Sequence, residues 1–214
     1  KVQKPGLFGS NSKSVVALND VSLKIERGET FSVVGESGSG KSTLAKTIAL
    51  LTSPDHGTIS IDGSLTSTLS RNERKILRQK IHLIFQDPYS SLNPRLSVGD
   101  IIMEPLIIQK IASRNDRLNS VSRALQEVGM QHSDINKYPH EFSGGQRQRI
   151  AIARAIVTKP DLIIADEPLS ALDVSIQSQI INLLMALKKQ QKLTYMFISH
   201  DLSVVSHLSD RVIV

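Results

Sequence analysis

GESGSGKS, residues 35–42, is the most informative stretch of this sequence. An apolar run, residues 30–34, leads into it, and a segment with helical spacing follows. It fits the pattern G-x-x-x-x-G-K-[ST], in which glycines let backbone N–H groups turn toward phosphate oxygens. Lys41 would neutralise the β- and γ-phosphates, Ser42 would offer a hydroxyl to Mg²⁺, and the helix start would add its positive end. The alternative, a surface turn before an ordinary helix, fits the strand-to-helix context less well.

The composition excludes several classes of protein. The chain has 214 residues, of which 40% are hydrophobic, so it can bury a core. It has no cysteine, which excludes disulfides and cysteine-bound zinc or iron–sulfur clusters within this span. No apolar run approaches the ~18 residues of a membrane helix. The net charge of +6 allows a nucleic-acid partner, but there is no Trp, and the basic stretch 71–80 is more typical of a solvated helix face.

Short apolar runs alternate with helical patterns along the chain. The predicted strands are 30–35, 58–63, 81–85, 162–166, 195–199 and 211–214. The predicted helices are 41–51, 116–129 and 174–190. The first would place Leu44, Ile48 and Leu51 on one face, and the second would do the same for Leu118, Val121, Leu125 and Val128. Nearly all-apolar strands between helices indicate a buried parallel sheet. Residues 87–160 hold turns and helices without a convincing strand, which predicts a helical insert.

The stretch LIIADEP places two carboxylates at the end of an apolar run. Asp166 can hold Mg²⁺ through its water shell, because Mg²⁺ prefers oxygen ligands and keeps several waters. Glu167 can polarise an attacking water as a general base or as an orienting acceptor. Alone, the pair would indicate only a solvated turn before a proline.

Two more predicted strands end in polar residues, Gln86 and His200. A single Gln or His is more often structural. In parallel α/β sheets, however, ligands bind beyond the carboxyl ends of the strands. We therefore expect Gln86, Glu167 and His200 to converge with the 35–42 loop on one edge.

FSGGQRQRIAIARAIV, residues 142–157, predicts a second helix start suited to an anion. Ser143 can cap this helix, and Gly144 and Gly145 stand in its first turn. One phosphate tail rarely needs two separate helix starts from one molecule. The second start is therefore predicted to serve a nucleotide held mainly by another copy. The alternative is an ordinary capped helix with Arg147, Arg149 and Arg154 exposed.

Together these motifs closely resemble the ATP-binding subunit of an ABC transporter, over essentially the whole chain and in the right order. GESGSGKST resembles Walker A, LIIADE Walker B, and FSGGQ the family signature, with Phe142 where leucine is commoner. Gln86 matches the Q-loop, SALD with Asp173 the D-loop, and His200 the switch histidine.

The resemblance implies a set of site residues, with ATP and Mg²⁺ as cofactors. Glu167, His200, Lys41 and Gln86 would be catalytic, and Ser42, Gln86 and Asp166 would hold Mg²⁺. ATP would contact Phe8, as the adenine-stacking aromatic, and Gly35, Glu36, Ser37, Gly38, Ser39, Gly40, Lys41, Ser42, Thr43 and Gln86. From the opposite subunit it would contact Ser143, Gly144, Gly145, Gln146 and Asp173.

The same resemblance implies an α/β P-loop NTPase of the ABC-ATPase type, with a mainly parallel sheet and an antiparallel β portion near the N-terminus. Residues 1–214 would form one nucleotide-binding domain. Residues 1–86 and 161–214 would be its catalytic core, and 87–160 a helical subdomain with the signature. A C-terminal extension is expected to be missing.

FQDPYSSLNPR, residues 85–95, resembles the string after the Q-loop in oligopeptide and dipeptide importer ATPases, especially the second of their two ATPase subunits. This implies import of peptides, or of nickel chelates or glutathione. The implied partners are a second ATPase subunit, two permeases docking on residues 86–110 and, indirectly, a substrate-binding protein outside the cell. The implied location is peripheral, on the cytoplasmic face of the membrane, with no nucleic acid bound.

Three alternatives stay open at this point. An ABC ATPase of DNA repair or chromosome organisation would suit the basic charge, but the sequence has no long coiled coil or zinc site. A single-site P-loop kinase or GTPase would have no use for FSGGQ. An exporter is possible, because the nucleotide-binding domain alone does not encode direction.

Overall fold

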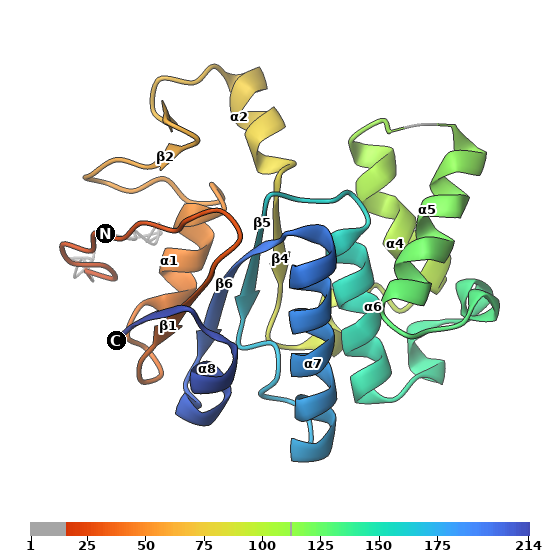
Figure 1. Ribbon diagram of the computed structural model, residues 1–214. Coiled ribbons are helices and arrows are strands. Elements are labelled where there is room, and N and C mark those ends of the chain that lie inside the picture. Colours follow the sequence, from red (N-terminus) through yellow and green to blue (C-terminus); the bar gives the residue numbers. More distant parts are fainter. Residues whose placement is uncertain (1–15, 112) are drawn as a thin grey trace, which may run out of the picture.

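The computed structural model describes residues 16–111 and 113–214, and its centre is a five-stranded parallel sheet (Figure 1). The strands lie in the order β4-β5-β6-β1-β7. Their bounds are β1 Thr30–Val34, β4 Ile81–Ile84, β5 Leu162–Asp166, β6 Thr194–Ser199 and β7 Arg211–Ile213. All four neighbouring pairs are parallel, so the strands end at one edge, called the carboxyl edge below. The parallel sheet predicted from the apolar runs is confirmed.

Helices cover both faces of the sheet (Figure 1). The four helices that cover it are α1 Lys41–Ile48, α6 Gly144–Ile156, α7 Val174–Gln191 and α8 Leu202–Leu208. Ile164 packs with α1 on one face, whereas Ile163 packs with α6, α7 and α8 on the other. Successive side chains of a strand point to opposite faces, so β5 has to be apolar throughout to bury both.

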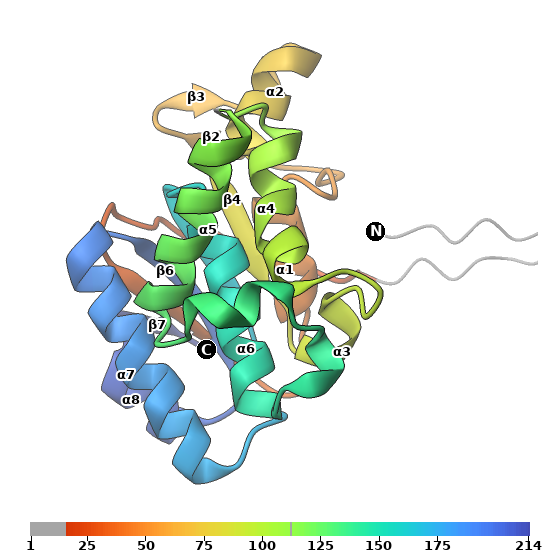
Figure 2. The same cartoon turned by 90° about the vertical axis from the view of Figure 1, so that its right-hand side faces the viewer.

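Between β4 and β5 the described chain forms helices and no strand, as expected from the sequence. These elements are α3 Pro88–Ser91, α4 Val98–Ile108, α5 Arg114–Glu127, the 3₁₀ turns His132–Asn136 and Pro139–Glu141, and α6. Figure 2 shows α3, α4 and α5 beside α6. Val121, Leu125 and Ile150 are fully buried and belong to the same cluster as the α6 face of the sheet. No helix in the described ranges is both long and apolar enough to cross a membrane.

The antiparallel portion is small. The expected strand 58–63 is only the first arm of a hairpin, β2 Ser60–Ile61 paired with β3 Ser64–Leu65. α2 (Arg71–Arg78) follows, with no buried residue and with a capping box between Ser70 and Glu73. The reading of the basic stretch 71–80 as a solvated helix face is therefore confirmed.

Two expected helical faces are partly wrong. The helix predicted over 41–51 ends at Ile48, because the chain reverses at Leu50, which has a φ of +58°. That reversal buries Leu50 and leaves Leu51 57% exposed, so Leu51 does not share a face with Leu44. In α5, Leu118 is 38% exposed at the outer margin of the apolar stripe.

Candidate functional site

The loop 35–40 runs from the end of β1 to the start of α1, at the carboxyl edge. Lys41 is 8% exposed, and its Nζ donates hydrogen bonds of 2.7 Å each to the carbonyl oxygens of Gly35 and Glu36. The ammonium therefore lies inside the loop and fixes its curvature. Ser39 N donates to Glu36 O at 3.2 Å and closes the turn. The loop is thus shaped before any anion arrives.

Glycine is required where this loop enters the helix. Gly40 has a φ of +98°, and a Cβ there would lie 2.3 Å from the carbonyl oxygen of Ala17. Gly40 is also the N-cap of α1 and provides no side-chain cap. The first N–H groups of α1 are therefore free of a capping side chain, and the positive end of the helix is open to an anion.

A carboxylate, an amide and an imidazole meet at the ends of three strands. Gln86 Nε2 donates to Glu167 Oε2 at 3.1 Å, and His200 Nδ1 lies 3.3 Å from the same oxygen. The Glu167 side chain is 17% exposed and that of His200 is 61% exposed. The expected convergence of these three residues is confirmed. The carboxylate is held but remains within reach of solvent.

The backbone of Glu167 is unusual for a residue with a side chain. Its φ is +47°, and its N–H donates to Ile198 O at 3.0 Å across to β6. Such a conformation costs about 1 kcal/mol or more and persists only where neighbours impose it. It turns the Glu167 carboxylate toward Gln86 and His200 directly after Asp166, which ends β5.

The residue after His200 caps α8. Asp201 is the N-cap of this helix, and its Oδ1 accepts hydrogen bonds from Ser203 N at 2.8 Å and Ser203 Oγ at 2.6 Å. The Ser203 hydrogen bonds hold the pKa of Asp201 below its usual range. An ionised carboxylate therefore follows His200 at neutral pH.

The residues at this edge fit a magnesium ion that is completed by phosphate. Ser42 is exposed in the first turn of α1, Asp166 is half-buried, and the Gln86 amide oxygen is not engaged by Glu167. These are the hard oxygen donors that Mg²⁺ prefers. The described residues contain no group of three or more His, Cys, Asp or Glu side chains that could hold a metal by itself.

The signature stretch stands at the start of α6, on the sheet face opposite α1. Ser143 Oγ accepts from Gln146 N at 3.4 Å, and Gln146 Oε1 accepts from Ser143 N at 3.0 Å, which makes a capping box. A Cβ on Gly145 would lie 2.5 Å from Ile176 Cγ2, so this glycine lets α7 approach α6 closely. Because α6 and α1 pack in different clusters on opposite faces of the sheet, this helix start and the start of α1 lie on different layers.

Most of the remaining predicted site residues are exposed to solvent. Asp173 is exposed at the N-cap of α7 and its side chain makes no capping bond. Glu36, Ser37, Gly38 and Ser39 are exposed along the loop, and Thr43 is half-buried in α1. Phe8 lies outside the described residues. The alternative of a simple capped helix with exposed arginines does not hold for Arg147, which is 8% exposed. Its guanidinium contacts the Tyr89 ring and donates to the carbonyl oxygen of Pro139.

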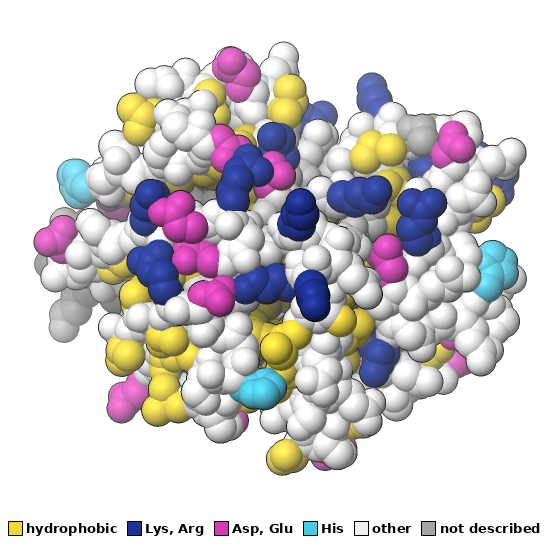
Figure 3. Space-filling model, viewed as in Figure 1, with side chains coloured by type: hydrophobic (Ala, Val, Ile, Leu, Met, Phe, Trp, Pro, Cys, Tyr) yellow, Lys and Arg dark blue, Asp and Glu magenta, His cyan; other side chains and the backbone are white. Residues whose placement is uncertain are grey.

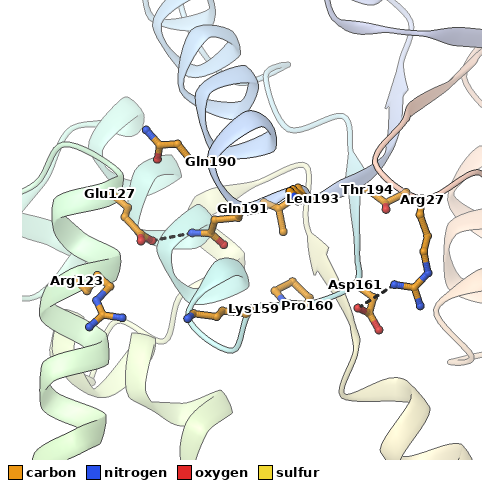
Figure 4. Close-up of a pocket in the computed structure, with 11 residues that line it drawn as sticks. Arg27, Arg123, Glu127, Lys159, Pro160, Asp161, Gln190, Gln191, Leu193 and Thr194 are labelled. Atoms are coloured by element: carbon orange, nitrogen blue, oxygen red, sulfur yellow. Dashed lines mark hydrogen bonds and ion pairs between the residues drawn. The ribbon is translucent and has the colours of Figure 1, made fainter.

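A cavity of about 480 Å³ lies at the opposite edge, where β5 and β6 begin (Figure 4). Arg123, Lys159 and Lys192 line it together with Glu127, which accepts from Gln191 Nε2 at 2.9 Å. The helices α5, α6 and α7 all end beside it, and cations are expected at the negative ends of helices. Its charge is accounted for by these helix ends, and it is not part of the carboxyl-edge site.

Surface charge is mixed on the face shown in Figure 3, where acidic side chains lie among the Lys and Arg side chains. Arg27 pairs with Asp62 at 2.8 Å, and Lys80 pairs with Asp161 at 3.3 Å. On this face the net positive charge does not form the uninterrupted basic stripe that a nucleic-acid backbone would require.

Comparisons with known proteins agree with this geometry. A family model described as ABC transporter matches residues 18–170. The chain is 48% identical over 209 residues to the di/tripeptide transport ATP-binding protein DppF of Pseudomonas aeruginosa (strain UCBPP-PA14), covering 98% of this chain and 64% of that protein. It is 50% identical over 210 residues to the oligopeptide transport ATP-binding protein AppF of Bacillus subtilis (strain 168), with the same 98% and 64% coverage. The chain therefore spans less than two thirds of the length of these relatives.

Solved structures give the same result for the fold. The dimeric post-hydrolysis state of the ATP-binding cassette MJ0796, bound to ADP and Pi, has a TM-score of 0.83 and 33% identity, covering 96% of this chain and 89% of that one. The structure of cbiO1 from Clostridium perfringens, part of the ABC transporter complex cbiONQ, has a TM-score of 0.84 and 30% identity, covering 96% and 84%.

Proposed function

The chain belongs to the ABC transporter family, and from that membership we propose that it is the ATP-binding and ATP-hydrolysing subunit of an importer for peptides or related small solutes. The observation that carries the hydrolytic part is the contact of Gln86 and His200 with one oxygen of Glu167, at the same sheet edge as the lysine-bearing loop. The names of the relatives support peptides as the substrate class over nucleic acid.

In this proposal the loop binds the triphosphate and Glu167 activates the water. Lys41 exchanges its bonds to Gly35 O and Glu36 O for bonds to phosphate oxygens. Ser42, Gln86 and Asp166 would hold Mg²⁺, and the bound ion would neutralise part of the phosphate charge. A Glu167 carboxylate oxygen accepts a proton from the attacking water, and the His200 imidazole stabilises the charge that develops.

The active unit is proposed to be a pair of ATPase subunits that enclose two ATP molecules head to tail. Ser143, Gly144, Gly145, Gln146 and Asp173 then contact the nucleotide of the partner subunit. The position of the α6 start on the face opposite α1 supports this arrangement, because Ser143 and Lys41 of one chain stand on different layers. The relative MJ0796 is dimeric in its solved structure.

The permeases are proposed to dock on residues 86–110, which places the subunit at the cytoplasmic face of the membrane. Large apolar side chains are exposed in and beside this segment: Phe85 43%, Tyr89 63%, Ile107 51% and Ile108 61%. Phe85 and Tyr89 follow the carboxyl end of β4, whereas Ile107 and Ile108 stand at the end of α4, and exposed apolar side chains can mark a protein-binding surface. A substrate-binding protein would act on the permeases, with no direct contact to this chain.

The decisive substitution is Glu167→Gln in the full-length protein. The amide keeps the size of the side chain but cannot accept the proton, so ATP turnover with Mg²⁺ should fall roughly 100-fold or more while ATP binding persists. Turnover is measured by phosphate release and binding by equilibrium titration. Glu127→Gln makes the same chemical change at the opposite sheet edge and should leave turnover intact. Near-normal turnover in Glu167→Gln would refute the assigned role.

The substrate class is tested in cells. A strain that lacks this gene should lose uptake of labelled di- or tripeptides, and the wild-type gene should restore it, whereas Glu167→Gln should not. Normal peptide uptake in the deleted strain, together with salt-dependent DNA binding by the purified protein, would favour the nucleic-acid alternative.

A further inference from the structure

Residues 87–91 form a rigid step directly after Gln86. Asp87 caps α3, since its Oδ1 accepts from Tyr89 N at 2.8 Å and its Oδ2 accepts from Ser90 N at 3.3 Å. Pro88 occupies the first turn and is buried. A short turn fixed at both carboxylate oxygens and by a proline ring has little freedom to bend. A displacement of Gln86 is therefore passed on to Tyr89.

Two arginines attach this step to α6. The Arg147 guanidinium carbon lies 3.8 Å from the centroid of the Tyr89 ring, and Arg154 Nη1 donates to Ser91 O at 2.8 Å. Residues seven apart on a helix lie on the same side, about two turns from each other. One side of α6 therefore holds α3 at both of its ends.

Arg147 is a buried cation whose counterpart is an aromatic ring. It is 8% exposed, its Nε donates to Pro139 O at 2.7 Å, and no ion pair with a carboxylate is found for it in the described part of the chain. Tyr89 is 63% exposed, so its ring is not there to fill the core. The face of an aromatic ring attracts a guanidinium, more strongly when the cation is desolvated.

The contact lies on a short route between two parts of the site. At one end, Gln86 donates to Glu167. At the other, Arg147 N donates to Ser143 O at 2.9 Å, one helical turn from the signature serine. We propose that Tyr89 and Arg147 are positioning residues that tie the Ser143 end of α6 to the carboxylate site of the same chain. This rests on the proposed function, because Ser143 and Glu167 would then serve different nucleotides.

The consequence is coupling between the two nucleotides of a pair. When a nucleotide displaces Gln86 from Glu167, the α3 step transmits the shift through the Tyr89 ring to Arg147. The start of α6 then changes its position toward the partner's nucleotide.

The test compares Tyr89→Leu with Tyr89→Phe in the full-length protein without permeases, so that permease contacts cannot contribute. Phe keeps the ring face and Leu removes it at an exposed position. ATP hydrolysis is measured against ATP concentration, and thermal unfolding is measured alongside. With Tyr89→Leu, the Hill coefficient should fall from about 2 toward 1 and half-saturation should rise severalfold, while the midpoint of unfolding should fall by no more than about 2–4 °C, the loss expected from one cation–π contact. Tyr89→Phe should match the wild type.

The other outcomes are decisive too. A Hill coefficient that Tyr89→Leu leaves unchanged, or a wild type with a coefficient of 1, would overturn the coupling. Equal loss in Tyr89→Phe would assign the effect to the hydroxyl and overturn the role of the ring. Absence of any ATP hydrolysis by the wild type would instead reject the proposed function, which separates the two failures.

Discussion

At the scale of single residues, the site depends on groups whose position is imposed by their neighbours. Glu167 keeps a positive φ because its N–H is bonded across to β6 and its carboxylate is held by Gln86 and His200. Strained backbone of this kind concentrates at functional positions. Gly40 shows the converse, since its lack of a side chain is what allows the loop to pass Ala17.

Gly40→Ala tests that close approach. A Cβ there would lie 2.3 Å from Ala17 O, which forces the backbone to move, so ATP affinity should fall roughly tenfold or more, about 1.4 kcal/mol. Gly57→Ala is the matched control, because Gly57 has a φ of +93° and open space around it. It should lose about 1–2 kcal/mol of stability without losing ATP affinity. Titration and urea unfolding measure the two quantities, and equal ATP affinity in both variants would contradict the steric account.

At the scale of elements, β7 is joined to the rest of the sheet through the residue that precedes it. Asp210 accepts from Thr30 N at 2.7 Å and pairs with Lys188 near the end of α7. The hydrogen bond from Lys188 is the main cause that holds the pKa of Asp210 below its usual value of 3.8. A lowered folded-state pKa of an acid means that its stabilisation is present above the unfolded pKa and is lost as pH falls through the folded one.

Asp210→Asn should therefore lower the unfolding midpoint at pH 7. The difference in unfolding midpoint between the variant and the wild type should shrink as pH falls below about 4, because the wild-type carboxyl then loses its charge by protonation. Calorimetry between pH 7 and pH 2.5 gives this profile. Asp20→Asn, at an exposed position in another part of the chain, should run parallel to the wild type. A difference that stays constant to the lowest pH would contradict the ion-pair explanation.

The sequence predicted the elements that carry local signals. The loop at Gly35–Ser42, the strands ending at Gln86, Glu167 and His200, and the capped start of α6 all follow from spacing and residue type. The burial of Arg147 could not be predicted in this way, because its partners Tyr89 and Pro139 come from other segments. The end of α1 was also missed, since nothing in the apolar spacing marks the reversal at Leu50.

At the scale of the whole molecule, the two helix starts proposed to bind phosphate, those of α1 and α6, belong to different layers. α1 covers one face of the sheet and α6 covers the other. If the starts of both helices bind the same phosphate, the two helices have to come from different chains. The molecule would then be half of a functional unit. On the face shown in Figure 3, acidic and basic side chains are interspersed.

Dimerisation of the full-length protein in the presence of ATP can be measured from its molecular mass in solution. In a Glu167→Gln background, ATP with Mg²⁺ should convert the chain to a dimer, as seen by analytical ultracentrifugation. Adding Ser143→Arg should block that dimer, because the bulk and charge would occupy the place of the partner's nucleotide. Asn119→Arg adds the same charge to an exposed position of α5 and should not interfere. A dimer of unchanged stability with Ser143→Arg would exclude Ser143 from the contact.

Lys41 already satisfies its ammonium with two carbonyl oxygens of its own loop. An incoming nucleotide thus meets a loop whose backbone is already ordered. Only the Lys41 ammonium has to change partners, so the rate of capture should approach the limit set by diffusion. Discrimination between ATP and ADP would then have to come from how long each stays, that is, from the residence time and not from the speed of entry.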